Sequence, residues 1–142
     1  MDDIILPSGN SQFLANNLIV TVGAAPWGNG WITSSTGEQV STFHFDVHDP
    51  GLRGVRPGVA PPFSSSDGRR FGTVTDQIVG PFLFRREERT LYVWQEPEDK
   101  LIFTTQLGHS FIQSAEAALS NDGSRVAVLN GRKVSMYNLP AR

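Results

Sequence analysis

The sequence predicts an all-β fold built from repeated antiparallel units of four strands, and three observations predict it. Val, Ile, Thr and aromatic residues gather in short runs that alternate with polar residues, which is the period of a half-buried strand. Each run is bounded by Gly, Pro, Asn or Asp, the residues that turns require. A turn of the type Ser-x-Asp-Gly also recurs along the chain, which indicates an internal repeat.

The repeated turn is clearest at residues 120–127, SNDGSRVA, which align with residues 65–72, SSDGRRFG. A weaker copy lies at residues 8–15, SGNSQFLA, so that the starts are 57 and then 55 residues apart. Ser and Asp can cap such a turn through side-chain hydrogen bonds, and Gly can take the positive φ that the turn needs. The repeat predicts units at residues 1–46, 47–108 and 109–142, within a single all-β domain or a fragment of a larger one.

The runs give the strands expected in each unit. They lie, in chain order, at residues 4–8, 12–23, 30–36, 38–45, 59–64, 69–75, 89–95, 100–107, 115–120, 124–130 and 133–139. Residues 110–119 contain Ala and Glu and would tolerate a helix, but a helix of this length is marginal alone. The first two units have four expected strands each, whereas the third lacks its fourth strand.

Several motifs together resemble the blades of WD40-like and TolB-like β-propellers. They are the Asp-Gly turn between the first two strands, LYVW at residues 91–94, and the outer strand that ends in Leu107, Gly108 and His109; residues 91–110 match best. The resemblance implies a propeller-like array of four-stranded antiparallel blades, in which His109 forms a hydrogen bond within its blade. Two features depart from the pattern: Gln95 follows Trp94 where Asp is usual, and the loop at residues 48–62 is long. A single β-sandwich is the alternative fold.

The number of units poses a physical problem, because closed propellers need about four to eight blades to bury every blade face. Three blades would leave two apolar sheet faces open. The chain could be part of a longer protein, or two copies could complete a six-bladed ring as a homodimer. Alternatively, the segment MDDIIL could supply the missing outer strand of the third unit.

Composition excludes several classes of function. The net charge of -2 argues against a nucleic-acid partner, and the absence of cysteine excludes disulfides, thiolate metal sites and cysteine nucleophiles. Arg85, Arg86 and Arg89 alternate with acids and are expected at a solvated loop or strand edge. The N-terminus lacks the features of a signal peptide, and no apolar run approaches the ~18 residues of a membrane span. We therefore expect a soluble protein with no membrane contact, whose compartment the sequence does not indicate.

Two groups of residues are candidates for a site. His44, Asp46 and His48 alternate along an expected strand and could share one face, which suits Zn or Fe(II) only if the strand bends. Otherwise they form the polar side of a strand. Trp27 and Trp31 flank a Gly-Asn-Gly turn and could form an aromatic platform for a partner; in the other interpretation Trp31 packs between blades.

The remaining polar motifs are better explained as turns. Ser64, Ser65 and Ser66 lack the glycines of a nucleophile elbow, and Asp67 and Asp122 lack the further acids of a calcium loop. With no catalytic group and no cofactor indicated, the sequence predicts a non-catalytic binding scaffold for a protein partner or for a second copy of itself. The alternative is a recognition or gating propeller of a larger enzyme, such as a hydrolase, whose catalytic part lies outside this chain.

Overall fold

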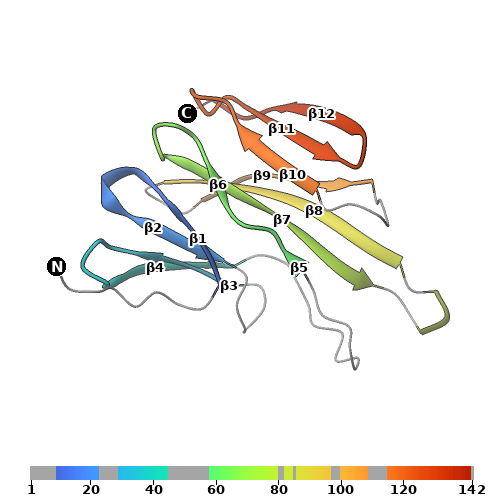
Figure 1. Ribbon diagram of the computed structural model, residues 1–142, viewed down its shortest axis with the longest axis horizontal. Helices are drawn as coiled ribbons and strands as arrows, with labels where there is room; N and C mark the ends of the chain where they lie inside the picture. The colour runs from blue at the N-terminus through green and yellow to red at the C-terminus, as the bar shows by residue number, and fades with distance from the viewer. Residues whose placement is uncertain are drawn as a thin grey trace.

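A computed structural model describes residues 9–22, 29–44, 58–79, 82–84, 86–96, 100–108 and 115–141. Within these ranges the chain forms three antiparallel sheets and two short 3-10 helices (Figure 1). The all-β prediction is therefore confirmed.

The N-terminal sheet has the strand order β1-β2-β3-β4, with β1 (Asn10–Phe13), β2 (Ile19–Val22), β3 (Asn29–Thr33) and β4 (Gln39–His44). The single strand expected at residues 12–23 is wrong, because the chain reverses direction between Leu14 and Leu18 through the 3-10 turn η1 (Ala15–Asn17). Asn16 and Asn17 both have a φ of 58°, a conformation that Asn tolerates better than most residues. The strand expected at residues 4–8 lies outside the described residues.

The central sheet has the order β5-β7-β8-β9, with β6 also paired to β7. Its strands are β5 (Gly58–Val59), β6 (Phe63–Ser64), β7 (Arg70–Val79), β8 (Arg86–Gln95) and β9 (Lys100–Leu107). Pro61 and Pro62 interrupt the run expected at residues 59–64, because proline cannot donate to the ladder. The long β7–β8 hairpin, with η2 (Phe82–Phe84) near its tip, extends beyond the other two sheets (Figure 1).

The C-terminal sheet has the order β10-β11-β12, with β10 (Ala115–Leu119), β11 (Arg125–Asn130) and β12 (Lys133–Asn138). The part of the helix-tolerant stretch that is described, residues 115–119, is therefore a strand. In the described chain β12 is an edge strand of this sheet.

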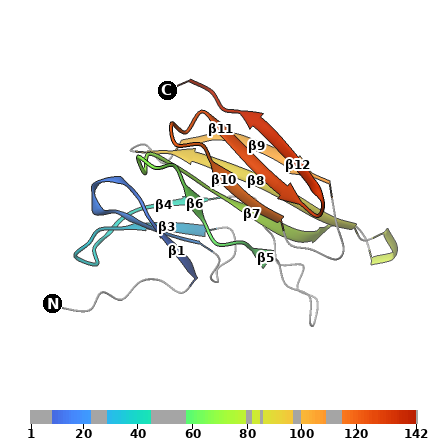
Figure 2. The same ribbon diagram turned by 45° about the horizontal axis from the view of Figure 1, so that its top comes forward.

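The three sheets stack face to face, and the central sheet is covered on both faces (Figures 1 and 2). In the first core, Trp94 lies 4.7 Å from Phe43 and 5.5 Å from Phe71, measured between ring centroids. The second core is aliphatic in its buried part, where Val74, Leu91 and Val93 of the central sheet face the C-terminal sheet through Ala115, Val126 and Val128. Because side chains alternate along β7 and β8, one set faces the N-terminal sheet and the other set faces the C-terminal sheet.

The same face of each sheet points toward the next sheet in the sequence. One backbone hydrogen bond closes each of the turns between β1 and β2, β6 and β7, and β10 and β11. These bonds run from Leu14 N to Leu18 O, from Ser65 N to Arg70 O, and from Ser120 N to Arg125 O. Leu18, Arg70 and Arg125 therefore occupy equivalent positions in the three sheets. Two residues after each of them come Val20, Gly72 and Ala127. We call the face that carries these residues the forward face and the opposite one the back face. Val20 belongs to the first core, which lies between the N-terminal and central sheets, so the sheets stack head to tail.

Arg70 joins the central sheet to the C-terminal sheet from the forward face of β7. Only 1% of its surface is exposed, and its guanidinium donates to Gly123 O at 2.7 Å and to Pro140 O at 2.6 Å. Two further bonds, of 3.1 and 2.9 Å, run to Oε1 of Gln95 on β8. A buried guanidinium requires acceptors for its donors, and these acceptors lie on both sheets.

Arg89 joins the same two sheets at the far end of β11. It is 4% exposed, forms an ion pair with Asp76 at 2.6 Å, and donates to Oδ1 of Asn130 at 2.5 Å. The expectation that Arg89 is solvated is therefore wrong, because its position opposite Asp76 turns it toward the C-terminal sheet. Arg85 and the side chain of Arg86 lie outside the described residues.

Replacing Arg70 with Met should lower the free energy of unfolding by about 2 to 4 kcal/mol, because two backbone carbonyls and Gln95 lose a charged donor in a buried place. The neighbouring and exposed Arg69 provides the matched control, and Arg69→Met should change stability by no more than about 0.5 kcal/mol. Urea denaturation followed by tryptophan fluorescence measures both. Equal midpoints for the two variants would show that Arg70 does not hold the sheets together.

Candidate functional site

The three turns that connect the first and second strands of each sheet lie at one edge of the stack (Figure 1). We call them the first turn (residues 14–18), the second turn (65–70) and the third turn (120–125), each counted between its hydrogen-bonded ends. In the second turn the hydroxyl of Ser65 donates to Asp67 at 2.6 Å, and the same carboxylate oxygen accepts the backbone N–H of Arg69 at 3.1 Å. Asp67 thus caps the turn, as the sequence predicts.

The third turn repeats these bonds around Asp122. The Oδ1 atom of Asp122 accepts the backbone N–H of Ser124 at 3.0 Å and the hydroxyls of Ser120 and Ser124, both at 2.7 Å. These bonds lower the pKa of Asp122 from 3.8 to about 2, the bond from the Ser124 backbone contributing most. The predicted capping role of Asp122 is confirmed.

Each turn contacts the next. Ala15 N donates to Gly68 O at 3.2 Å between the first and second turns, and Ser66 Oγ donates to Asn121 Oδ1 at 2.9 Å between the second and third turns. A Cβ at Gly68 would overlap the backbone nitrogen of Ala15, so only glycine permits this approach. The turns therefore form a continuous polar edge across the three sheets.

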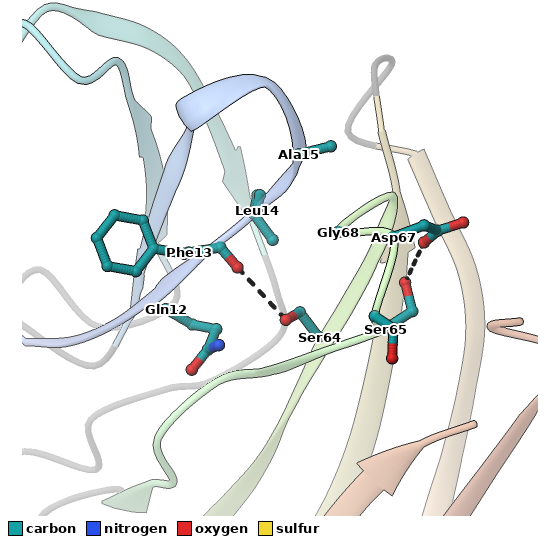
Figure 3. A pocket seen from close by; sticks show the side chains of 9 residues that line it. Gln12, Phe13, Leu14, Ala15, Ser64, Ser65, Asp67 and Gly68 are labelled. Carbon is teal, nitrogen blue, oxygen red and sulfur yellow. Dashed lines mark hydrogen bonds between the residues drawn. The ribbon is translucent and has the colours of Figure 1, made fainter. Parts of the chain in front are cut away.

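A cavity of about 420 Å³ lies where the first and second turns meet (Figure 3). It is lined by the end of β1 and its turn, and by the end of β6 and its turn: Gln12, Phe13, Leu14, Ala15, Ser64, Ser65, Ser66, Asp67 and Gly68. The side chains of Gln12 and Ser64 point into the space between the two strands, whereas the ring of Phe13 points away from the second turn (Figure 3). The volume falls in the range of ligand pockets.

The chemistry of this cavity is that of neutral hydrogen bonding. The hydroxyl of Ser64 donates to Phe13 O at 3.4 Å, a long bond that links β6 to β1. Gln12 is exposed and offers both a donor and an acceptor. Ser65 and Asp67 are occupied with each other in the cap. Such a lining suits a polar, extended ligand such as a peptide backbone.

We call the contact between the N-terminal and central sheets the first junction, and that between the central and C-terminal sheets the second junction. A second cavity, of about 360 Å³, lies in the second junction, at the end of β9. It is lined by Gln106 and Leu107 of β9, by the following Gly108, and by Val128, Asn130, Lys133, Ser135 and Tyr137 of the C-terminal sheet. The side-chain amide of Asn130 donates to Gly108 O while its Oδ1 atom accepts from Arg89. Asn130, which lines this cavity, is thus held from two sides.

The residues predicted for a site do not line either of these two cavities. Trp31 is half-buried on the back face of β3 and belongs to neither of the two cores, so both interpretations of this residue stay predictions. His44 Nδ1 lies 2.5 Å from Oδ1 of Asn29. Trp27, Asp46, His48 and His109 lie outside the described residues. Among those that are described, no group of three His, Cys, Asp or Glu side chains could hold a metal ion.

The sequence interpretation missed Gln12 and Phe13, which it placed inside one long strand. The available signal was Leu14-Ala15-Asn16-Asn17-Leu18, in which two Asn residues can supply the positive φ values that Gly supplies in the other turns. An alignment of this stretch with the Asp-Gly turns makes Phe13 equivalent to Ser64, so that each is the last residue of a strand before its turn.

Comparison with known proteins finds no family model that matches this chain and no match among the curated proteins. In the described ranges, no helix is long and apolar enough to cross a membrane.

Replacing Gly68 with Ala should separate the first and second turns and destabilise the protein. The positive φ alone costs about 1 to 2 kcal/mol for a residue with a side chain, and the overlap with Ala15 adds to this. At Gly108 a Cβ would meet no atom, so Gly108→Ala is the matched control and should be nearly neutral. Thermal unfolding monitored by circular dichroism compares them. If Gly68→Ala and the parent protein have the same melting temperature, the two turns are not in contact.

The stability of the protein should depend on the ionisation of Asp122. Its pKa in the folded protein, about 2, lies below the ordinary value of 3.8, so the carboxylate stabilises the fold above pH ~4. This stabilisation is lost as the pH falls from ~4 to ~2. The difference in urea midpoint between the parent protein and Asp122→Asn should therefore shrink over that range. Glu38→Gln, which changes an exposed carboxyl outside this turn, serves as the control. If the difference in urea midpoint for Asp122→Asn stays constant over this pH range, Asp122 does not cap the turn.

Proposed function

We propose that this chain is a propeller-like scaffold that binds a protein partner and catalyses no reaction of its own. The observation that carries the proposal is the head-to-tail stacking of three antiparallel sheets, with equivalent turns in contact at one edge. Radial repetition of four-stranded sheets is the principle of a β-propeller. A two-sheet sandwich has one core between two layers, whereas the described residues enclose two cores between three layers.

The binding role rests on the cavity between the first and second turns. Repeat proteins commonly bind partners on the surface where equivalent turns line up, because the turns vary while the sheets hold them rigidly. Here Gln12 and Ser64 offer hydrogen bonds on facing strands, and the cavity of about 420 Å³ has room for a short peptide segment. The ligand best matched to this lining is an extended, uncharged polar segment of a partner protein.

The hydrogen bonds of the cavity favour binding over catalysis. The hydroxyl of Ser65 donates to Asp67, and its oxygen accepts the backbone N–H of Arg70 at 3.1 Å. The Asp67 oxygen that accepts this hydroxyl also accepts the backbone N–H of Arg69, so both groups are engaged in capping the turn. His44, the histidine of the described chain, is bonded to Asn29 in the N-terminal sheet.

A selection from a random peptide library displayed on phage, with the folded protein immobilised, tests the proposal. Peptides that bind should be enriched, and their affinity, measured by fluorescence polarisation, should fall about tenfold in the double variant Gln12→Ala, Ser64→Ala. A loss of this size corresponds to about 1.4 kcal/mol, the scale of one or two hydrogen bonds.

Leu83→Ala is the matched control, since Leu83 is exposed at the tip of the β7–β8 hairpin and lies outside the cavity. It should leave the affinity unchanged. Selected peptides that bind the cavity variant and the parent protein equally would refute this cavity as the binding site. A selection that enriches no peptide would refute the proposed ligand class.

A further inference from the structure

The forward face of the C-terminal sheet carries a group of exposed apolar side chains, with the exposed Glu116, Arg125 and Asn138 beside them. Leu129, Val134 and Met136 lie on it with 42, 65 and 62% of their surfaces exposed. Ala127 lies between them on β11, and Arg125 lies at the turn end of the same strand. Three large apolar side chains together on one sheet face indicate a surface that another molecule covers.

This face has the same pattern as a face that is covered within the chain. In the central sheet Arg70 pairs with Gln95, and in the C-terminal sheet the equivalent Arg125 pairs with Asn138. From these pairs the other positions follow by counting along the strands. Gly72, Val74, Leu91 and Val93 of the central sheet correspond in turn to Ala127, Leu129, Val134 and Met136.

The two faces differ in their burial. Val74, Leu91 and Val93 are buried in the second core beneath the back face of the C-terminal sheet. Arg70 is buried with them, whereas Arg125 is exposed. The C-terminal sheet therefore presents the apolar centre and the arginine of a sheet-to-sheet junction without the sheet that would cover them.

The other half of such a junction lies at the opposite end of the stack. Phe13 directly precedes the first turn, as Leu119 precedes the third turn, and Leu119 packs against the second core from a back face. Phe13 is 72% exposed on the back face of the N-terminal sheet, the face on which Trp31 of β3 is half-buried. Ile19, Thr21 and Thr33 on this face are already buried in the single chain, so the available contact area centres on Phe13.

We propose that the forward face of the C-terminal sheet binds the back face of the N-terminal sheet of a second copy of this chain. The two copies then contact each other at two equivalent junctions and form a closed ring of six sheets. The contact is head to tail, like the two junctions inside the chain. Head-to-tail contacts close into a ring when the rotations from one sheet to the next add up to a full turn. The inference rests on the propeller-like stack proposed above, but it does not depend on the peptide-binding cavity.

Hydrogen bonding at the turns gives this junction its register. In the second junction the carbonyl of Gly123 accepts from Arg70, and in the first junction the carbonyl of Gly68 accepts from Ala15 N. In each case a donor of the preceding sheet reaches a carbonyl of the next turn. Arg125 of one copy is placed to donate to a carbonyl of the first turn of the other copy.

The solution mass tests the assembly. The parent protein should elute as a single species at twice the chain mass of 15.6 kDa in light scattering behind a sizing column. Met136→Glu should reduce the mass to that of one chain, because a carboxylate would be buried without a partner. Leu83→Glu, which places the same charge on an exposed Leu outside the junction, should leave the mass doubled. A parent protein that remains a monomer at all concentrations overturns the proposal.

Disulfide trapping distinguishes head-to-tail contact from a symmetric dimer of two forward faces. The chain has no cysteine, so single introduced thiols report without background. Inside the chain β10, which precedes the third turn, packs against β7, which follows the second turn. The strands in these positions at the proposed contact are β1, which precedes the first turn, and β11, which follows the third turn. Phe13 on β1 should therefore lie against β11 of the other copy. A mixture of Phe13→Cys and Ala127→Cys proteins should form a mixed disulfide under mild oxidation.

Ala127→Cys alone should form no disulfide dimer, since Ala127 lies in the middle of the forward face and meets a back face instead. A disulfide dimer of Ala127→Cys by itself would show that two forward faces meet and would overturn the proposal. Circular dichroism of each variant confirms that it is folded. A parent protein that is a monomer but still binds the selected peptides would refute the assembly and leave the proposed function standing.

Discussion

The burial of Arg70 is the constraint on which the arrangement of the C-terminal half depends. A guanidinium away from water is stable only if its donors find acceptors, and the acceptors of Arg70 come from three places: Gln95, Gly123 and Pro140. Gln95 fixes the guanidinium on the central sheet, Gly123 fixes the third turn, and Pro140 fixes the chain after β12. The position of the C-terminal sheet, the conformation of its turn and the path of the last residues are therefore coupled through one side chain.

The length of each turn decides which face of the next strand points forward. The second and third turns have one residue more than the first between their hydrogen-bonded ends, and side chains alternate along a strand. Because the two Asn residues of the first turn take the place of the longer Asp-Gly turn, Leu18 rather than Ile19 is equivalent to Arg70. Val20 and Val22 consequently face the central sheet, as the packing of the first core requires.

Local signals predicted most of the fold, and long-range contacts account for what was missed. The Asp-Gly turns were predicted correctly because Ser65, Asp67 and their equivalents bond within a few residues of each other. Arg89 was misjudged, because its burial depends on Asn130, which is distant in the sequence. The cavity at Gln12 and Ser64 could not be predicted for the same reason, because its two walls are far apart in the chain. In addition, residues 12–23 were predicted as one strand, whereas the chain turns within them.

The two internal junctions are stabilised in different ways, and this difference bears on the open forward face. The first junction packs aromatic rings, with Phe43 in contact with both Phe71 and Trp94, and its turns are joined by a backbone hydrogen bond. The second junction packs aliphatic side chains between two buried arginines, which penalise any shift of register because a displaced charge would lose its acceptors. The open face, with Leu129, Met136 and Arg125, belongs to the second type. Its apolar residues supply most of the driving force for association, whereas the arginine restricts the partner to a sheet that offers a turn carbonyl at that position.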